Sequence, residues 1–327
     1  MPIDLLIVIG LALLFEFLNG MRDSSNIVAT MISSRAFSPQ IALGMTAVAE
    51  FFAPFIFGTV VARTIGGGIV QSDVLTLNML IACLTGAIIW NSLTWFFGIP
   101  SSSTHALVGG MLGSVLVAVG TGAIKFSGLN RVLIALFVSP IVGFAVGFLV
   151  LRLIYLLASR ASPNINDFFK RGQFFTALAL AFSYGTNDAQ KTMGIITLGL
   201  IISGMLDKFA VPTWVIFISA ATTAVGTLLG GWRLVRTLGG KFYKIRPVHS
   251  FATQLTSALV ILSASFVGLP VSTTQVVSSA IIGVGSSERL GKVRWSVADD
   301  ILTAWVITIP ASALFSAGIY WLVVNFT

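Results

Sequence analysis

Apolar residues form long runs along this chain, and each run is long enough to cross a bilayer or to form one arm of a hairpin inside it. A helix needs about 20 apolar residues to cross the hydrocarbon core. The runs cover 3–33, 40–62, 76–97, 103–120, 131–158, 172–204, 212–230, 250–266, 272–285 and 297–325. They predict an all-α polytopic membrane protein with about 10–12 membrane segments.

Four of these runs have features that a plain membrane helix lacks. The runs 3–33 and 172–204 are too long for one plain span, and each holds a polar motif. We interpret them as discontinuous helices that unwind or bend near Gly20 and Gly185. The runs 103–120 and 272–285 follow Gly-x-Pro sequences, which break helices. They are therefore predicted to be the return arms of two helical hairpins.

Composition supports the membrane assignment and excludes several other classes. Of 327 residues, 56% are hydrophobic and 9% charged, against roughly a quarter charged in soluble domains. The net charge of +8 comes mostly from loops, so we expect no nucleic-acid partner. Cys83 is the only cysteine and there are two histidines. The sequence holds no P-loop motif and no nucleophile–base pattern, so we expect neither an enzyme nor a bound cofactor.

The two halves of the chain repeat each other. Matched pairs are Asp23 with Asp188, Arg63 with Arg236, Pro100 with Pro270, Gly113 with Gly283, and Pro140 with Pro310. Their order is kept and their separation changes by only a few residues. The pattern predicts a duplication with an N-terminal repeat at 1–158, a cytoplasmic linker at 159–171 and a C-terminal repeat at 172–327.

Loop charges predict how the chain is oriented. Most lysines and arginines outside the motifs fall on one side when the spans alternate and each hairpin returns to the side that it left. Basic loops stay inside, so both termini are predicted to be outside. The segment that starts at Met1 lacks a basic leader region and is interpreted as a first membrane helix. Each half then crosses three times, and the repeats are inverted relative to each other.

The two hairpin motifs suggest an oxyanion site. Serine and threonine beside a proline cap helix N-termini, where free N–H groups and partial positive charge attract anions. The predicted phosphate-binding hydroxyls are those of Ser102, Ser103, Thr104, Ser272, Thr273 and Thr274. The alternative is that these hydroxyls only hydrogen-bond back to their own helices.

The two acidic motifs suggest cation sites. A carboxylate inside a bilayer is costly and is usually functional. The predicted oxygen ligands for sodium are those of Asp23 with Asn26, and of Asp188 with Asn187 and Gln190, helped by the carbonyls of broken helices. A proton on either aspartate is a second possibility. A third is a structural ion pair, formed by Asp23 with Arg22 or by Asp188 with Lys191.

Three further polar residues lie in apolar sequence. Glu50 is a candidate third cation or proton site, or else a glutamate that faces a water-filled cavity. Glu16, about one turn before the first motif, is a weaker candidate. His105 is interpreted as a hydrogen-bonding helper, because its counterpart in the second half is Gln275.

Several of these motifs together resemble the inorganic phosphate transporters of the PiT type. The stretches that carry the resemblance are Gly185-Thr-Asn-Asp-Ala-Gln-Lys191, Gly268-Leu-Pro-Val-Ser-Thr-Thr274 and Thr303-Ala-Trp-Val-Ile-Thr-Ile-Pro310. The first motif departs from the family pattern, with Arg22 where many relatives have asparagine and Ser25 where many have alanine. Gln254 stands where some relatives carry glutamate.

The resemblance implies import of inorganic phosphate coupled to a cation gradient, through an inverted-repeat fold that is often dimeric. We therefore expect a multi-pass protein of the plasma (inner) membrane whose partners are phosphate, sodium and lipid, with a homodimer as a further expectation. Proton coupling and a sulfate symporter of the same fold remain alternatives. An anion channel is a third alternative. The carboxylates at the site argue against it, because unpaired acids repel anions.

Overall fold

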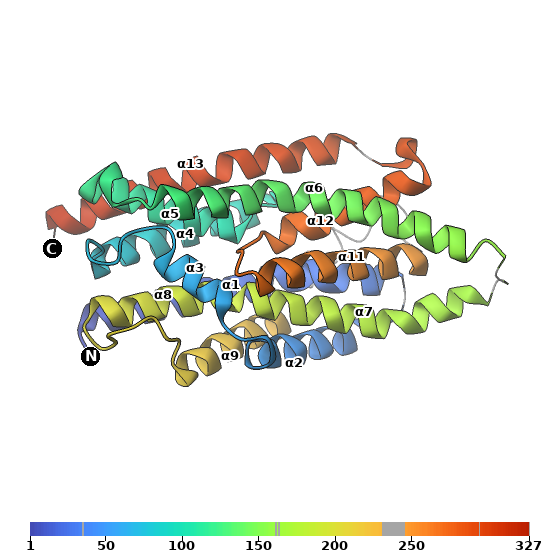
Figure 1. Ribbon diagram of the computed structural model, residues 1–327, viewed down its shortest axis with the longest axis horizontal. Helices are drawn as coiled ribbons and strands as arrows, with labels where there is room; N and C mark the ends of the chain where they lie inside the picture. Colours follow the sequence, from blue (N-terminus) through green and yellow to red (C-terminus); the bar gives the residue numbers. More distant parts are fainter. Residues whose placement is uncertain (35, 161, 163, 231–245, 294, 327) are drawn as a thin grey trace.

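The described residues of the computed structural model form an elongated helical bundle (Figure 1). The description covers residues 1–326 except 35, 161, 163, 231–245 and 294. Both termini lie at the same end of the bundle (Figure 1). The predicted all-α class is confirmed. The Arg236 match to Arg63 lies outside the described residues.

The helices of the first half are α1 (Ile3–Ser33), α2 (Pro39–Phe57), α3 (Val60–Gly67), α4 (Leu77–Phe97), α5 (Ser103–Val119) and α6 (Phe126–Leu157), with the short 3₁₀ turn η1 (Thr121–Ala123) before α6. Those of the second half are α7 (Ile165–Asn187), α8 (Ala189–Ile202), α9 (Thr213–Leu229), α11 (Pro247–Phe266), α12 (Thr273–Glu288) and α13 (Trp295–Phe326), with η2 (Leu290–Lys292) before α13. Among the described residues, five helices are long and apolar enough to cross a membrane: α1, α2, α4, α6 and the Ile301–Phe326 part of α13.

Two helical hairpins enter the bundle from opposite ends. The hairpin of α4 and α5 starts from the end that holds the termini, and the hairpin of α11 and α12 starts from the other end (Figure 1). Each first arm ends at a glycine with positive φ, Gly98 at 69° and Gly268 at 71°. This left-handed conformation ends a helix and favours glycine. Both tips therefore stop midway along the bundle.

Glycines let each hairpin pack against the last helix of the opposite half. On α5, a Cβ at Gly109 or Gly113 would overlap the backbone of α13 at Ile309 or Ala313. On α6, a Cβ at Gly147 would lie 2.9 Å from the backbone oxygen of Ala280 in α12. Small residues bring helix backbones close together in membranes, where lipid supplies little driving force for association. The two halves therefore interlock.

Three expectations about helix breaks need correction. The predicted break near Gly20 is wrong, because α1 runs unbroken from Ile3 to Ser33. The absent side chain of Gly20 instead admits the backbone of Thr223 on α9. The predicted break near Gly185 comes three residues later, at Asp188, which alone separates α7 from α8. The run 40–62 divides at Gly58, whose φ is 79°.

Candidate functional site

The hairpin tips are capped helix N-termini that lie inside the protein. The side chain of Ser102 accepts a hydrogen bond from the backbone nitrogen of His105 at 3.2 Å. Ser272 does the same for the nitrogen of Gln275 at 3.4 Å. All six predicted phosphate-binding residues, Ser102, Ser103, Thr104, Ser272, Thr273 and Thr274, are at most 7% exposed. The tips therefore place hydroxyls and helix N-termini together, away from solvent.

The two tips contact each other. Thr104 of the first hairpin donates its hydroxyl hydrogen to the backbone oxygen of Val271 in the second, at 3.0 Å. His105 Nδ1 lies 3.5 Å from Gln275 Nε2 and 2.8 Å from Ser102 Oγ. His105 therefore acts in the structure as a hydrogen-bonding partner between hairpins. The structure brings together two motifs that lie about half the chain apart.

Two adjacent threonines of the second tip hold one aspartate from each half. Thr273 donates to Asp188 Oδ2 at 3.0 Å, and Thr274 donates to Asp23 Oδ1 at 3.1 Å. Both aspartates are buried. Two of the predicted oxyanion residues are therefore hydrogen-bonded to the two aspartates predicted to bind cations.

Each of the two aspartates also has a cationic neighbour. Lys191, which is completely buried, forms a salt bridge with Asp188. The Nε atom of Arg22 lies 3.5 Å from Asp23 Oδ1. Both ion pairs that the sequence left as alternatives are therefore present. Two positive charges face these two negative charges before any substrate or coupling ion is considered.

The three predicted amide ligands fall in different places. Asn26 donates to Asp23 Oδ1 and to Thr274 Oγ1, each at 3.3 Å, and so belongs to the first acidic site. Asn187 donates to Ser265 Oγ at 2.9 Å and to the backbone oxygen of Leu269, on either side of the second hairpin turn. Gln190 accepts from the nitrogen of Ala62 and donates to the oxygen of Gly58, so its amide is used in joining α8 to the break between α2 and α3.

Two oxygen atoms of the predicted cation ligands have no hydrogen-bond partner among the described residues. They are Asp23 Oδ2 and Asn187 Oδ1, and both are buried. Buried polar atoms are nearly always paired, so an unpaired carboxylate or amide oxygen marks a place where a cation fits. The unbroken α1 supplies no free main-chain carbonyls beside Asp23, contrary to the expectation from a broken helix.

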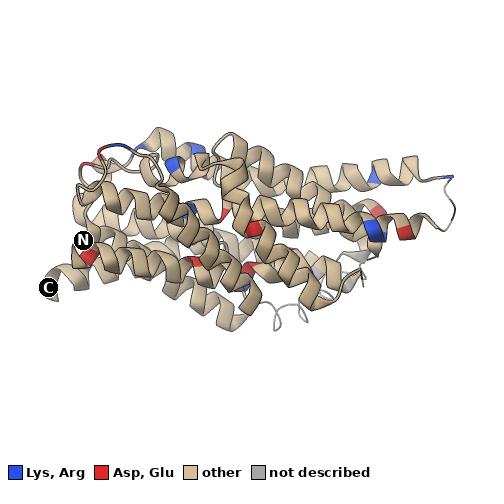
Figure 2. Cartoon of the chain, turned by 90° about the horizontal axis from the view of Figure 1, so that it is seen from below, with Lys and Arg blue, Asp and Glu red and all other residues tan. Residues whose placement is uncertain are grey.

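Two buried glutamates, one on α1 and one on α2, accept hydrogen bonds from threonines that lie one turn apart on α9. Glu16 accepts hydrogen bonds from Thr192 at 2.7 Å and from Thr223 at 2.6 Å. Glu50 accepts from Thr227 at 2.5 Å. Acidic segments lie midway along the bundle in Figure 2, and both glutamates belong to the interior, since Glu16 is 0% and Glu50 2% exposed.

Sequence reasoning missed four residues of this polar interior. Tyr184 is buried one turn before Asp188, and its hydroxyl has no hydrogen-bond partner among the described residues. Its spacing of four residues from Asp188 was a usable signal, because it puts both on one helix face. Thr192, Thr223 and Thr227 lie outside the repeated motifs, and single threonines in apolar runs give no such signal.

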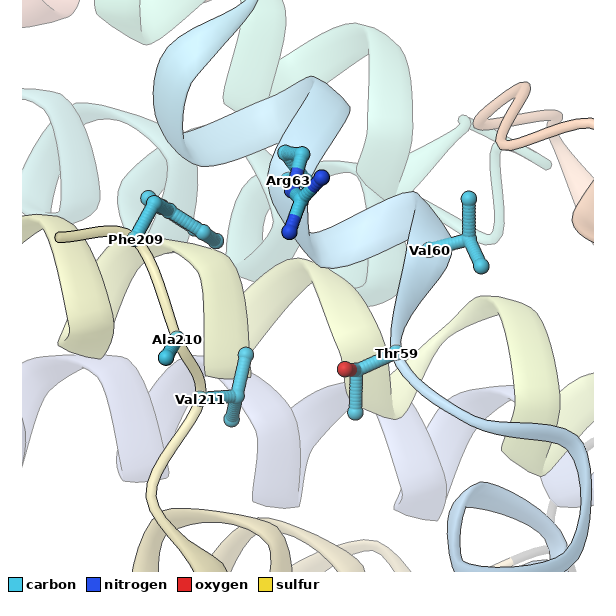
Figure 3. Close-up of a pocket in the computed structure, with 6 residues that line it drawn as sticks. All are labelled: Thr59, Val60, Arg63, Phe209, Ala210 and Val211. Atoms are coloured by element: carbon cyan, nitrogen blue, oxygen red, sulfur yellow. The ribbon is translucent and has the colours of Figure 1, made fainter.

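A cavity of about 190 Å³ lies between α3 and the segment before α9 (Figure 3). Its lining includes Thr59, Val60, Arg63 and Phe209, and Arg63 is the charged residue among those drawn (Figure 3). The cavity is linked to the hairpin tips through α3, since Thr64 donates to the backbone oxygen of Gly268 at 2.6 Å. The described residues hold no cluster of three His, Cys, Asp or Glu side chains that would suit a transition metal.

Hairpins that meet at buried acids and hydroxyls, inside a bundle of apolar helices, define the class of protein, a polytopic membrane transporter. The chain belongs to the phosphate transporter family, whose sequence profile matches residues 19–316. The resemblance noted in the sequence is thereby confirmed. The relatives are transporters, so the expectation that the chain is not an enzyme is confirmed as well.

The curated relatives match over nearly the whole chain. A probable low-affinity inorganic phosphate transporter of Rhizobium meliloti (strain 1021) is 43% identical, over 96% of this chain and 94% of the relative. One from Bacillus subtilis (strain 168) is 42% identical, over 97% and 96%. A solved structure described as the sodium-dependent phosphate transporter has a TM-score of 0.91 and 24% identity, with 100% of each chain covered. That last likeness establishes the fold.

Proposed function

We propose that this phosphate transporter imports inorganic phosphate by symport with sodium ions. Phosphate binds between the tips, to Ser102, Ser103 and Thr104 on one side and to Ser272, Thr273 and Thr274 on the other. Sodium binds at Asp23 with Asn26 and at Asp188 with Asn187, and Glu50 is a further cation site. Gln190 contributes by holding α8 against the α2–α3 break.

One observation carries the proposal: Thr273 and Thr274 donate to Asp188 and Asp23. A hydroxyl has one hydrogen to donate, so neither threonine can donate to its aspartate and to phosphate at the same time. A cation on the carboxylate replaces the lost hydrogen bond and releases the hydroxyl for the anion. Cation binding at the aspartates thus favours phosphate binding at the tips, which is the coupling that symport requires.

The charge balance also favours symport over a channel. Arg22 and Lys191 already offset Asp23 and Asp188. Phosphate adds at least one negative charge to a buried site, and burying unbalanced charge is costly. Mobile cations that enter with the anion remove that cost. Sodium suits the unpaired oxygen atoms of Asp23 and Asn187, and a proton on an acidic side chain is the alternative coupling ion.

Alternating access follows from the opposed hairpins. The site residues are buried, so phosphate can enter only when one hairpin moves away from the other. The first hairpin reaches the tips from the end of the termini and the second from the opposite end (Figure 1). Movement of one hairpin at a time opens the site to one side of the membrane. The two inverted repeats, 1–158 and 172–327 around the linker 159–171, supply these two gates.

We place the protein in the plasma (inner) membrane, and the distribution of basic loops supports an orientation with both termini outside. On this orientation, the first hairpin gates the outer side and the second gates the inner side. The cavity beside Arg63 (Figure 3) then lies on the outer side of the second hairpin turn, because α3 is on the side of that turn toward the termini (Figure 1).

Uptake of labelled phosphate into proteoliposomes tests the proposal. We expect an inward sodium gradient, at equal pH and zero voltage, to concentrate phosphate above its external level. Accumulation driven only by a proton gradient would establish the alternative coupling ion. Competition by sulfate at similar concentration would favour the sulfate symporter. Phosphate flux that never exceeds its own gradient under either cation would indicate a channel and refute symport.

A further inference from the structure

The guanidinium of Arg22 lies beside the first hairpin tip. Its Nη1 donates to Asn91 Oδ1 on α4 at 3.1 Å and lies 3.4 Å from Ser101 Oγ at the start of the tip. The Nε atom of the same side chain lies 3.5 Å from Asp23 Oδ1. Arg22 therefore joins the first acidic motif to the first hairpin, and only 11% of its side chain is exposed.

Two donors in this group have no hydrogen-bond partner among the described residues. They are Arg22 Nη2 and Asn91 Nδ2, and both atoms are buried. Because Asn91 Oδ1 accepts from Arg22, the free end of that amide is its NH₂ group. A buried donor without a partner costs about 1–3 kcal/mol, and more when it is charged. Two unpaired donors on side chains that are hydrogen-bonded to each other indicate a missing acceptor.

The chemistry of that acceptor follows from the donors. A guanidinium and an amide NH₂ offer hydrogen atoms and positive charge, and neither can bind a metal cation. Arginine favours oxyanions because its planar fork can donate to two oxygen atoms of one anion. The adjacent Ser101 belongs to the tip whose next residues, Ser102 and Ser103, are proposed to bind phosphate. The acceptor that fits is an oxygen edge of the same tetrahedral anion.

We propose that Arg22, with Asn91 beside it, is a direct ligand of the transported phosphate and sets its affinity. The inference rests on the proposed function and adds a ligand from outside the hairpin motifs. On this proposal the two halves of the site use their cationic side chains differently. Arg22 keeps a nitrogen atom without a partner for the anion, whereas the single side-chain nitrogen of Lys191 contacts Asp188. The guanidinium of Arg22 is thus shared between Asp23 and the anion, while the coupling ions balance the charge that phosphate brings.

Equilibrium binding of radiolabelled inorganic phosphate to purified protein tests the inference over a range of sodium concentrations. Arg22→Asn should weaken binding roughly 10- to 100-fold, the factor that a charge-assisted hydrogen bond supplies. Arg22→Lys keeps the positive charge but lacks the planar guanidinium. Its phosphate affinity should therefore lie between those of the wild type and of Arg22→Asn. Asn91→Ala should weaken binding several-fold. The matched control is Arg152→Asn, an exposed arginine on α6 whose guanidinium lies over the Phe148 ring, and it should bind as the wild type does.

The sodium series separates a phosphate ligand from a residue that only organises the Asp23 site. A lost phosphate ligand weakens binding even at saturating sodium. Recovery of wild-type affinity in Arg22→Asn at high sodium would overturn the inference, as would unchanged affinity at all sodium concentrations. If Arg22→Asn fails to fold, unchanged binding by both Arg22→Lys and Asn91→Ala would overturn it. Wild-type protein that binds no phosphate would instead overturn the proposed function.

Discussion

Thr104 of the first hairpin donates its hydroxyl hydrogen to the backbone oxygen of Val271 in the second hairpin, at 3.0 Å. Because the hairpins enter from opposite ends of the bundle (Figure 1), this hydrogen bond joins the two proposed gates. It must break or lengthen whenever either tip moves away. The contact therefore belongs to the state in which both gates are closed.

Thr104→Val tests that relationship. The valine keeps the shape of threonine but leaves the carbonyl of Val271 without its donor, at a cost of about 1–3 kcal/mol. We expect a melting temperature that is lower by a few degrees and a higher half-saturating phosphate concentration. Thr303→Val is the control, since the Thr303 hydroxyl bonds only within α13, to Asp299. Equal behaviour of the two variants would contradict a role for the contact between tips.

Thr273→Val and Thr274→Val should each raise the half-saturating phosphate concentration. Each removes a hydroxyl that alternates between an aspartate and phosphate, and a loss of about 1.4 kcal/mol gives a tenfold change. Thr274→Val should also change the sodium response at Asp23, since Asn26 contacts the same hydroxyl. Uptake kinetics at fixed and varied sodium measure both effects. Thr222→Val, whose hydroxyl bonds its own helix at Ile218, should leave both quantities unchanged.

Asp23→Asn and Asp188→Asn should differ in their effect on stability. Asp188→Asn leaves the buried ammonium of Lys191 without its carboxylate, which costs about 3–5 kcal/mol for a buried pair. Asp23→Asn leaves Arg22 with Asn91 and Ser101 as partners, so it should cost less. Thermal unfolding of purified protein compares them. The double variant Asp188→Asn/Lys191→Gln should recover stability relative to Asp188→Asn, and equal loss in both single variants would contradict this asymmetry.

Glu50→Gln should reduce coupling while the fold is kept. The amide oxygen of glutamine can still accept from Thr227, which contacts Glu50 at 2.5 Å, but an amide cannot take up and release a proton or hold a cation as a carboxyl group can. We expect initial uptake rates to fall at least about tenfold and to depend less on the cation gradient. Rates measured against sodium and against pH identify the cation involved. Asp73→Asn in an exposed loop is the control, and wild-type gradient dependence in Glu50→Gln would remove Glu50 from the site.

Gly113→Ala should destabilise the contact between α5 and α13. A Cβ at this position would overlap the backbone of Ala313, and overpacking costs about 1–3 kcal/mol. Gly318→Ala on α13 has nothing within 4 Å of the new Cβ and should be neutral or slightly stabilising, since alanine favours helix. Melting temperatures in detergent compare the two. A Gly113→Ala variant as stable as the wild type would show that the helices can separate without cost.

The sequence by itself determined the class of the protein and the residues at its hairpin tips. Apolar runs fixed the membrane helices, because a bilayer admits only segments whose backbone groups are paired internally. The Gly-x-Pro breaks located both hairpin tips, because their local chemistry ends one helix and caps the next. The repeated motifs named Asp23, Asp188 and the tip hydroxyls, because polar groups are too costly in lipid to be placed there without use.

Only the tertiary structure decided how those residues are used. The pairing of Thr273 with Asp188 and of Thr274 with Asp23 joins residues far apart in the chain, which no local pattern encodes. The same holds for Gln190, whose amide binds the α2–α3 break, and for Gly20, which serves close packing rather than a bend. A glycine permits both outcomes, and only the neighbouring helix selects between them. Likewise, the free donor of Arg22 is defined by which of its hydrogen atoms the folded chain leaves unpaired.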